Sequence, residues 1–278
     1  MTVRTPEPAA VLAKAGRENF PVATALFPRA VRPHLMAVYG FARLADDIGD
    51  EAPGDRLALL DRLESEVDAL YAGTPSDPIV RRLLPTVRTF DIPSEPLQRL
   101  IEANRRDQDT HRYPTFDHLL GYCALSANPV GELVLRILGA WTPGRAELSE
   151  ATCTALQLVE FWQDLGEDAR RGRVYVPMED LERFGYSVDD LLGRRRDDRF
   201  GALMAFQAER TRELFAKGRP LAATLPGRMG FAVRLFTAGG IAALEDLERR
   251  GFDTFSSNAR ASRARRAWAA ARELGARR

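Results

Sequence analysis

The chain has 278 residues, of which 45% are hydrophobic and 28% charged, and its formal net charge is +1. This composition supplies a core for one large domain, and the near-neutral charge argues against nucleic-acid binding through bulk charge. Two cysteines, Cys123 and Cys153, form neither a metal-binding spacing nor a disulfide framework, which favours buried thiols in a reducing compartment. The sequence shows no signal peptide and no stretch of the roughly 20 apolar residues that a spanning helix needs. We therefore expect a cytoplasmic protein.

The hydrophobic pattern predicts an all-α chain with no strand and no internal repeat. Residues 1–8 are expected to form a disordered tail, 9–255 a single domain, and 256–278 a basic tail or helix. The predicted helices cover residues 34–50, 57–71, 79–90, 97–109, 119–139, 148–171, 181–192, 200–215 and 230–251. Pro33 suits a first helical turn and Thr115 a helix cap. Pro129 predicts a kink at Asn128, and the pair at 239–240 predicts a break in the last helix that suggests close helix contact or a wide cavity wall.

Two carboxylates, Asp46 and Asp50, lie four residues apart on the helix predicted for residues 34–50. Side chains at this spacing share one helix face, and like charges there destabilise a helix by a few tenths of a kcal/mol. A divalent cation or an arginine is expected to compensate. Tyr39 and Arg43 precede the pair and Asp47 lies within it, so this helix combines acids with an arginine and an aromatic residue.

A second acidic face has the same spacing, with Asp164 and Asp168 four residues apart and Glu167 between them. Arginines and an aromatic residue follow these acids at Arg170, Arg173 and Tyr175. A solvated helix face is the alternative interpretation for either cluster by itself. The joint occurrence of two such faces, more than a hundred residues apart, favours one cavity closed from two sides.

These two motifs, 39–50 and 164–175, resemble the signatures of the squalene/phytoene synthase family of head-to-head prenyl synthases, over about residues 19–255. Within the family, the sequence is most similar to the bacterial hopanoid branch of hydroxysqualene synthases, through residues 18–22, 126–131, 161–164 and 239–240. The asparagine-isoleucine-leucine-arginine-aspartate and valine-alanine-glycine-threonine runs usual in phytoene synthases are absent. Glu160 stands where the family usually has asparagine, which places an extra acid near the second motif.

The resemblance implies a helical prenyl synthase bundle with a central apolar cavity, and a Mg²⁺-dependent reaction of presqualene diphosphate with water to give hydroxysqualene and diphosphate. The expected metal ligands are Asp46, Asp50, Asp164 and Asp168, with Asp47 and Glu167 as auxiliary ligands. The same four aspartates with Tyr39 and Arg43 form the expected catalytic set. Substrate contacts are expected from Asn19, Phe20, Phe27, Tyr122, Asn128, Gly131, Gln157, Phe161, Arg170, Arg173 and Tyr175. Aromatic faces, including that of Trp162, would stabilise a carbocation.

Several alternatives remain open from the sequence. The first is condensation of two farnesyl diphosphates to presqualene diphosphate, squalene or dehydrosqualene. The second is a non-catalytic assembly factor of the same fold, although such relatives typically lose the paired aspartates. The expected partners are a prenyl diphosphate substrate, an enzyme that supplies presqualene diphosphate and a reductase that receives hydroxysqualene, with no nucleic acid. The basic tail favours a solvated helix, with peripheral contact at the inner face of a membrane as the alternative.

Overall fold

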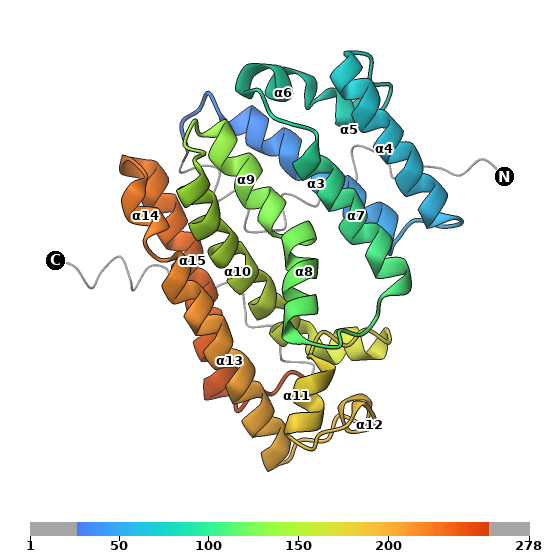
Figure 1. The fold of residues 1–278 in the computed structure, drawn as a ribbon, viewed down its shortest axis with the longest axis vertical. Coiled ribbons are helices and arrows are strands. Elements are labelled where there is room, and N and C mark those ends of the chain that lie inside the picture. The colour runs from blue at the N-terminus through green and yellow to red at the C-terminus, as the bar shows by residue number, and fades with distance from the viewer. Residues whose placement is uncertain (1–26, 256–278) are drawn as a thin grey trace.

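A computed structural model describes residues 27–255, and within this range helices are joined by turns and loops, with one isolated bridge between Arg112 and Val174 (Figure 1). The all-α prediction is confirmed. The helices are α3 (Arg32–Asp50), α4 (Arg56–Ala72), α5 (Pro78–Arg81), α6 (Leu84–Phe90), α7 (Glu95–Asp109), α8 (Phe116–Ser126), α9 (Asn128–Ile137), α10 (Pro143–Arg170), α11 (Met178–Arg183), α12 (Val188–Leu192), α13 (Asp198–Gly218), α14 (Leu221–Thr224) and α15 (Gly227–Arg249).

Local signals set several helix ends, and those at Pro33 and Thr115 were predicted from the sequence. Pro33 lies in the first turn of α3, where its missing N–H costs nothing. The Thr115 side chain accepts a hydrogen bond from the backbone N–H of His118 and caps α8. Asp55 caps α4 in the same way, through the N–H of Ala58. These short-range contacts need no tertiary partner, and so the sequence could predict them.

Three predicted helices are divided and one predicted break is wrong. The segments 79–90 and 181–192 each form two short helices, and 119–139 forms α8 and α9, which meet at Ala127 because Pro129 starts a new first turn. In contrast, α15 runs unbroken through Gly239 and Gly240. A Cβ on Gly240 would lie 2.5 Å from Leu156 Cδ2 and 2.7 Å from Phe215 Cζ, so this glycine allows close helix contact.

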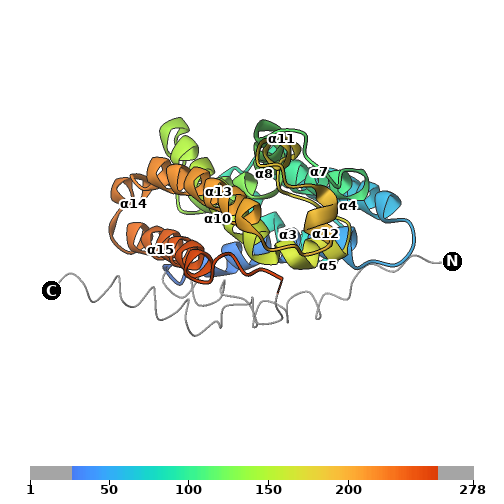
Figure 2. The same cartoon turned by 90° about the horizontal axis from the view of Figure 1, so that it is seen from below.

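The core of the described residues consists of two apolar clusters. One cluster joins α3, α4, α7 and α9, and the other joins α8, α10, α13 and α15. The helix α10 contacts α8, α9, α13 and α15, and α3 packs on α7 and α4. Figure 2 shows the bundle as a flat body with α15 and α3 along one side. None of the helices within 27–255 has the length and hydropathy to span a membrane.

Candidate active site

The first acidic motif occupies the last turns of α3. The helix end is fixed by Arg56, whose guanidinium donates to the carbonyls of Gly49, Asp50 and Ala52 at 3.0 Å each. These are carbonyls that the helix itself leaves unsatisfied. Asp46 and Asp50 are exposed, whereas Asp47 is buried. The motif therefore presents two of its three aspartates to solvent.

Arg43 pairs within its own helix, because its Nη2 lies 2.7 Å from Asp47 Oδ1 and 3.5 Å from Glu51 Oε1. Tyr39 is buried one turn before Arg43. These contacts give Asp47 a cation of its own.

The second acidic motif occupies the last turns of α10. Asp164 is exposed there, and Glu167 and Asp168 are half-buried. Glu167 Oε1 accepts from Arg171 Nη2 at 3.1 Å. The departure noted at Glu160 places an exposed acid on the same helix, one turn before Asp164.

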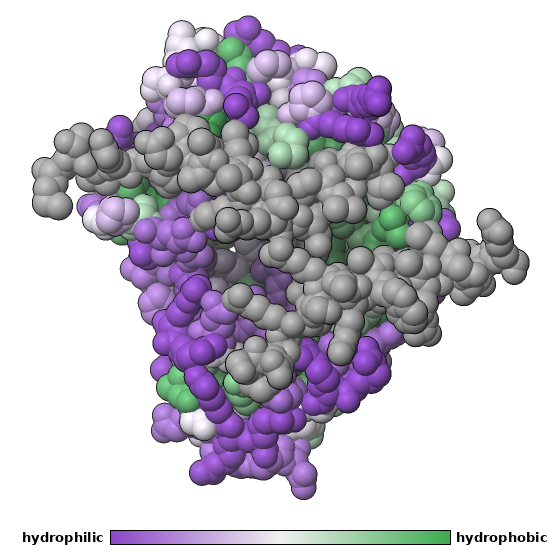
Figure 3. Space-filling view, turned by 180° about the vertical axis from the view of Figure 1, so that it is seen from behind, coloured by the Kyte–Doolittle hydropathy of each residue, from purple (hydrophilic) through white to green (hydrophobic). Residues whose placement is uncertain are grey.

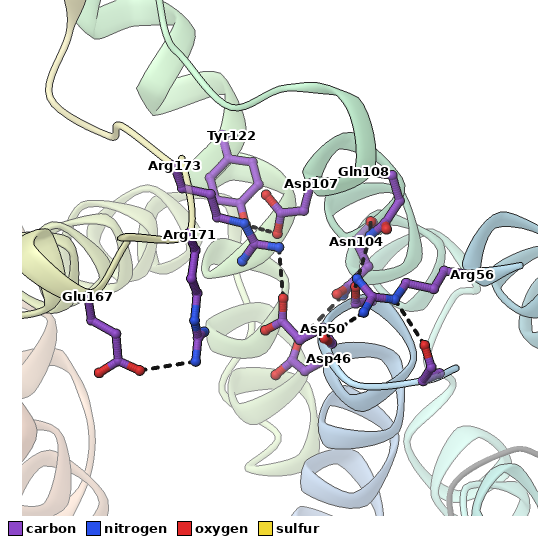
Figure 4. A network of polar contacts seen from close by, with 12 residues as sticks. Asp46, Asp50, Arg56, Asn104, Asp107, Gln108, Tyr122, Glu167, Arg171 and Arg173 are labelled. Atoms are coloured by element: carbon purple, nitrogen blue, oxygen red, sulfur yellow. Dashed lines mark hydrogen bonds and ion pairs between the residues drawn. The ribbon is translucent and has the colours of Figure 1, made fainter. Parts of the chain in front are cut away.

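Arg173 joins the two motifs. Its Nη2 lies 2.8 Å from Asp50 Oδ1, although 123 residues separate them in sequence. Figure 4 shows the guanidinium between Asp107 and Asp50. Burial by itself would lower the pKa of Arg173. The nearby negative charges, including those of Asp50 and Asp107, outweigh this effect and raise the pKa above its ordinary value. Of the two compensating groups expected for the acidic spacing, a divalent cation or an arginine, the loop after α10 supplies the arginine.

A third wall, which the sequence did not predict, comes from α7. Asn104 donates from Nδ2 to Asp46 Oδ1 at 3.4 Å, and Gln108 donates to the carbonyl of Gly49 at 3.0 Å. Asp107 accepts a 2.6 Å hydrogen bond from the hydroxyl of Tyr122. The other carboxylate oxygen of Asp107 is buried with no hydrogen-bond partner. The polar run 104–109 was visible in the sequence, but no spacing connected it with the two motifs.

Four aromatic rings lie beside these acids. Phe161 and Tyr175 stack with centroids 3.9 Å apart and an interplanar angle of 6°. Tyr113 and Tyr122 contact Tyr175 at centroid distances of 5.7 and 6.0 Å. Burial raises the pKa of all three tyrosines, so each stays a neutral phenol at physiological pH. The cluster offers aromatic faces that can stabilise a cation without a competing phenolate.

Three carboxylates at the site, Asp46, Asp107 and Asp168, have pKa values above the ordinary range of an aspartate. Burial raises the pKa of Asp46 to about 6, against the opposing effects of Asn104 and Arg43. Burial and the neighbouring Asp164 raise the pKa of Asp168 to about 7. Burial raises that of Asp107 to about 6. Asp46 is both exposed and closely surrounded by protein atoms, and a side chain on the wall of a concave site satisfies both conditions.

This donor set fits a hard divalent cation. Within residues 27–255, no three His, Cys, Asp or Glu side chains converge on one point. Mg²⁺ usually takes one or two carboxylates and completes its shell with phosphate and water. The pairs Asp46/Asp50 and Asp164/Asp168 match that requirement, and burial raises the pKa of one member of each pair, Asp46 and Asp168.

Several expected substrate residues have structural partners. Asn128 accepts from Thr154 Oγ1 at 3.0 Å, and a Cβ on Gly131 would meet Ser149 and Cys153 of α10. Phe27 packs in the first core cluster. Arg170 is exposed and donates to the carbonyl of Gly166. These four positions lie in helix packing or at a helix end, whereas Tyr122, Phe161, Arg173 and Tyr175 come together at the site.

Three further expectations complete the set. Gln157 is half-buried on α10, seven residues before Asp164 and therefore on the same side of the helix. Trp162 is buried and donates from Nε1 to Thr211 Oγ1 at 2.9 Å, which makes it a packing residue between α10 and α13. Asn19 and Phe20 lie outside the described residues.

Gly49 supplies a test of how α7 is held against α3. An added Cβ would clash with the Asn104 side chain, with Cγ only 3.0 Å away. We expect Gly49→Ala to lower the free energy of unfolding by ~1–3 kcal/mol through overpacking. The measurement is urea unfolding. The control is Gly121→Ala in α8, where no atom lies within 4 Å, and a gain of up to ~1 kcal/mol is expected. Equal effects at both positions would contradict this packing role.

The pKa of Asp168 predicts a pH-dependent stability. Folding raises it from the ordinary 3.8 to about 7, so the folded state binds the extra proton between these values. The contribution to stability is full below pH 4 and is lost as the pH rises to 7. In chelator, Asp168→Asn should therefore raise the unfolding temperature at pH 8 by ~3 °C, for a screened effect of ~1 kcal/mol. No gain in unfolding temperature is expected at pH 4. Equal gains at both pH values would contradict the conclusion that the ionised Asp168 destabilises the fold.

Comparisons with known proteins agree with this geometry. The squalene/phytoene synthase family model matches residues 13–267. The structure of squalene synthase HpnC from Alicyclobacillus acidocaldarius is 43% identical, with a TM-score of 0.83 over 89% of this chain and 97% of that one. A dehydrosqualene synthase in complex with ligand has the same fold, with a TM-score of 0.84 at 22% identity over 97% and 95% of the two chains.

Two curated relatives point to different products. Phytoene synthase of Arthrospira platensis is 32% identical over 257 residues, which cover 87% of this chain and 83% of that protein. Hydroxysqualene synthase of Zymomonas mobilis is 37% identical over 182 residues, which cover 63% and 59%.

An all-helical bundle with two facing acidic helices and an arginine between them defines the isoprenoid synthase class. The chain belongs to the squalene/phytoene synthase family. Members of this family are enzymes of head-to-head isoprenoid condensation and generally depend on a divalent metal.

Proposed function

We propose that the protein converts presqualene diphosphate and water to hydroxysqualene and diphosphate. The observation that supports this proposal best is the 43% identity to squalene synthase HpnC over 89% of the chain. The hydroxysqualene synthase of Zymomonas mobilis adds 37% identity over a shorter range. Presqualene diphosphate carries an anionic head and two long apolar arms, which suit a bundle with a charged end and an apolar interior.

The charged residues would act on the diphosphate. Asp46, Asp50, Asp164 and Asp168 would hold Mg²⁺, which would neutralise the negative charge of the departing diphosphate. Arg173 can donate two hydrogen bonds to phosphate oxygens in the bidentate geometry of a guanidinium group. The diphosphate would replace Asp50 as its partner. The protein thereby stabilises charge as it develops.

The aromatic cluster would act on the carbocation left after ionisation. The stacked pair Phe161 and Tyr175 and the neighbouring Tyr122 form this cluster, and Tyr175 interacts electrostatically with Arg173. A desolvated cation gains roughly 2 kcal/mol from an aromatic face. Capture by water then releases a proton, and Asp107 has a buried oxygen without a hydrogen-bond partner that could receive it. The pKa of Asp107, about 6, permits this role near neutral pH.

A second candidate is head-to-head condensation of two prenyl diphosphates, with phytoene, squalene or dehydrosqualene as the product. The identity of 32% to a phytoene synthase over 87% of the chain favours keeping this candidate. Both candidates use the same acidic pairs and the same arginine. They differ in the first substrate and in the fate of the cation.

Product analysis separates the two candidates. Purified protein with Mg²⁺ receives presqualene diphosphate, with and without NADPH, and in separate tubes farnesyl or geranylgeranyl diphosphate alone. Hydroxysqualene from presqualene diphosphate in both NADPH conditions, with the other substrates largely unused, is the expected result. Squalene only with NADPH would refute water capture. Phytoene or presqualene diphosphate from the precursors would assign the condensation reaction instead. We also propose that an upstream synthase supplies the presqualene diphosphate and that a reductase receives the hydroxysqualene.

A further inference from the structure

Two segments at one end of the bundle contain no acidic residue, although exposed acids follow the first of them at Glu147 and Glu150 in the first turns of α10. The chain contains 39 Asp and Glu among 278 residues, but residues 133–146 and 214–244 contain none. The cations in these two stretches are Arg136, Arg145, Lys217, Arg219, Arg228 and Arg234. Arg136 pairs with Glu132, so the excess positive charge of these segments comes mainly from the exposed Lys217, Arg219, Arg228 and Arg234.

The two stretches meet in the fold. Arg145 Nη1 donates to the carbonyl of Ala140 at 3.1 Å, and its Nη2 donates to the carbonyl of Thr224 at 2.6 Å. The connection between α9 and α10 is thereby fixed to α14, which packs on the start of α15. Figure 1 shows these segments together at the upper left. We call this region, made of residues 136–145 and 217–234, the basic end.

The basic end also exposes two large aromatic side chains. Trp141 and Phe231 keep 38% and 36% of their surface, in a protein that buries most of its aromatic side chains. The Arg136 guanidinium lies 4.4 Å from the Trp141 ring centroid. Figure 3, seen from behind, shows a hydrophobic area on the side where α14 lies. Exposed aromatic side chains next to cations are typical of proteins that bind membrane interfaces.

Four cations of the basic end are available to an external anion. Lys217, Arg219, Arg228 and Arg234 are exposed and make no ion pair with the described part of the chain. Other exposed arginines do find carboxylates, as Arg171 does with Glu167. Arg228, Phe231 and Arg234 follow at three-residue spacing and therefore lie along one side of α15.

We propose that the basic end docks on an anionic lipid surface. Anionic lipids attract clustered Lys and Arg over about a Debye length, and aromatic rings insert at the headgroup level. The orientation also suits the acidic motifs. Asp164 follows Pro143 by 21 residues in α10, which corresponds to roughly 30 Å along the helix. The carboxylates are thus held at the far end, away from a surface that would repel them.

The test uses the full chain with Trp268→Phe, which leaves Trp141 and the buried Trp162 as the tryptophans. The vesicles contain brominated phosphatidylcholine, with or without ~30 mol% phosphatidylglycerol. We expect quenching of Trp141 fluorescence only on the anionic vesicles, and reversal in high salt. In the same background, Lys217→Glu with Arg219→Glu and Arg228→Glu should weaken vesicle binding more than ~10-fold.

Two further variants with similar charge changes test whether the basic end is the part of the protein that contacts the vesicle. Arg62→Glu with Arg82→Glu and Arg88→Glu reverses three other exposed arginines that form no ion pair with the described part of the chain, and it should leave binding intact. Reversal of the tail arginines Arg260, Arg263, Arg265 and Arg266 should also leave Trp141 quenching in place. Equal losses in the control would mean bulk charge, and loss only with the tail variant would assign the contact to the tail. Either result, or no quenching on anionic vesicles, would overturn the proposal. Circular dichroism confirms that each variant is folded.

Discussion

Asp164→Asn combined with Asp168→Asn should lower turnover of presqualene diphosphate by more than ~10³-fold, which corresponds to about 4 kcal/mol of transition-state stabilisation. The two carboxylates form one face of α10 at its C-terminal end, and Asp164 raises the pKa of Asp168 by repulsion. Amides keep the shape but carry no charge, so they bind Mg²⁺ weakly. Steady-state kinetics at several Mg²⁺ concentrations measures the effect.

The double variant should fold at least as well as the parent protein, because the removed charges repel each other in the metal-free state. Its helical circular dichroism should be unchanged. The matched control is Glu147→Gln with Glu150→Gln, which neutralises two exposed acids at the other end of the same helix. Control activity should stay within about twofold of the parent. Turnover retained in the aspartate variant would refute the assignment of this motif to the metal.

Arg173→Gln should reduce kcat/KM by ~10²–10³-fold, because it removes up to two charge-assisted hydrogen bonds to the diphosphate, worth ~1.5–3 kcal/mol each. It should also destabilise the metal-free protein by about 1–2 kcal/mol, since Asp50 and Asp107 lose the cation between them. Mg²⁺ should restore part of that stability. Kinetics and thermal unfolding, with Mg²⁺ and with chelator, measure both effects.

Arg170→Gln is the matched comparison, three residues away and with the same loss of charge. Arg170 is exposed and donates to a backbone carbonyl at the end of α10, so we expect less than about a threefold change in kcat/KM. A loss as large as that of Arg173→Gln would restore the sequence-based prediction that Arg170 contacts substrate. An unchanged kcat/KM in Arg173→Gln would contradict the role proposed for this arginine in binding the diphosphate.

Spacing along the chain predicted the parts of the site that a single helix defines. Asp46 and Asp50 share a face of α3, and Asp164 and Asp168 share a face of α10, because residues four apart on a helix are neighbours. The same local logic predicted the cap at Thr115 and the interruption near Asn128. The predicted break at 239–240 was wrong, whereas the close helix contact suggested there is found at Gly240, where packing against Leu156 and Phe215 offsets the weak helix propensity of glycine.

Spacing along the chain could not predict roles that depend on where a side chain points in the fold. Nothing in the sequence assigns different roles to Arg170 and Arg173. In the structure, Arg170 donates to a carbonyl of its own helix, whereas Arg173 contacts Asp50. Asn128 and Gly131 read as cavity residues, but the first bonds to Thr154 and the second lies where α9 meets α10. Periodicity gives the face of one helix and contains no information on what that face meets.

The sequence by itself determined the all-α class, the two acidic motifs and the family resemblance, because each depends on residue types and short-range spacing. Only the tertiary structure decided that α7 completes the site. Asn104, Asp107 and Gln108 reach Asp46, Tyr122 and Gly49 because α7 packs between α3 and α8. The raised pKa values of Asp46 and Asp168 have the same origin. Desolvation and repulsion between charges depend on distances through space, and only folding brings those groups together.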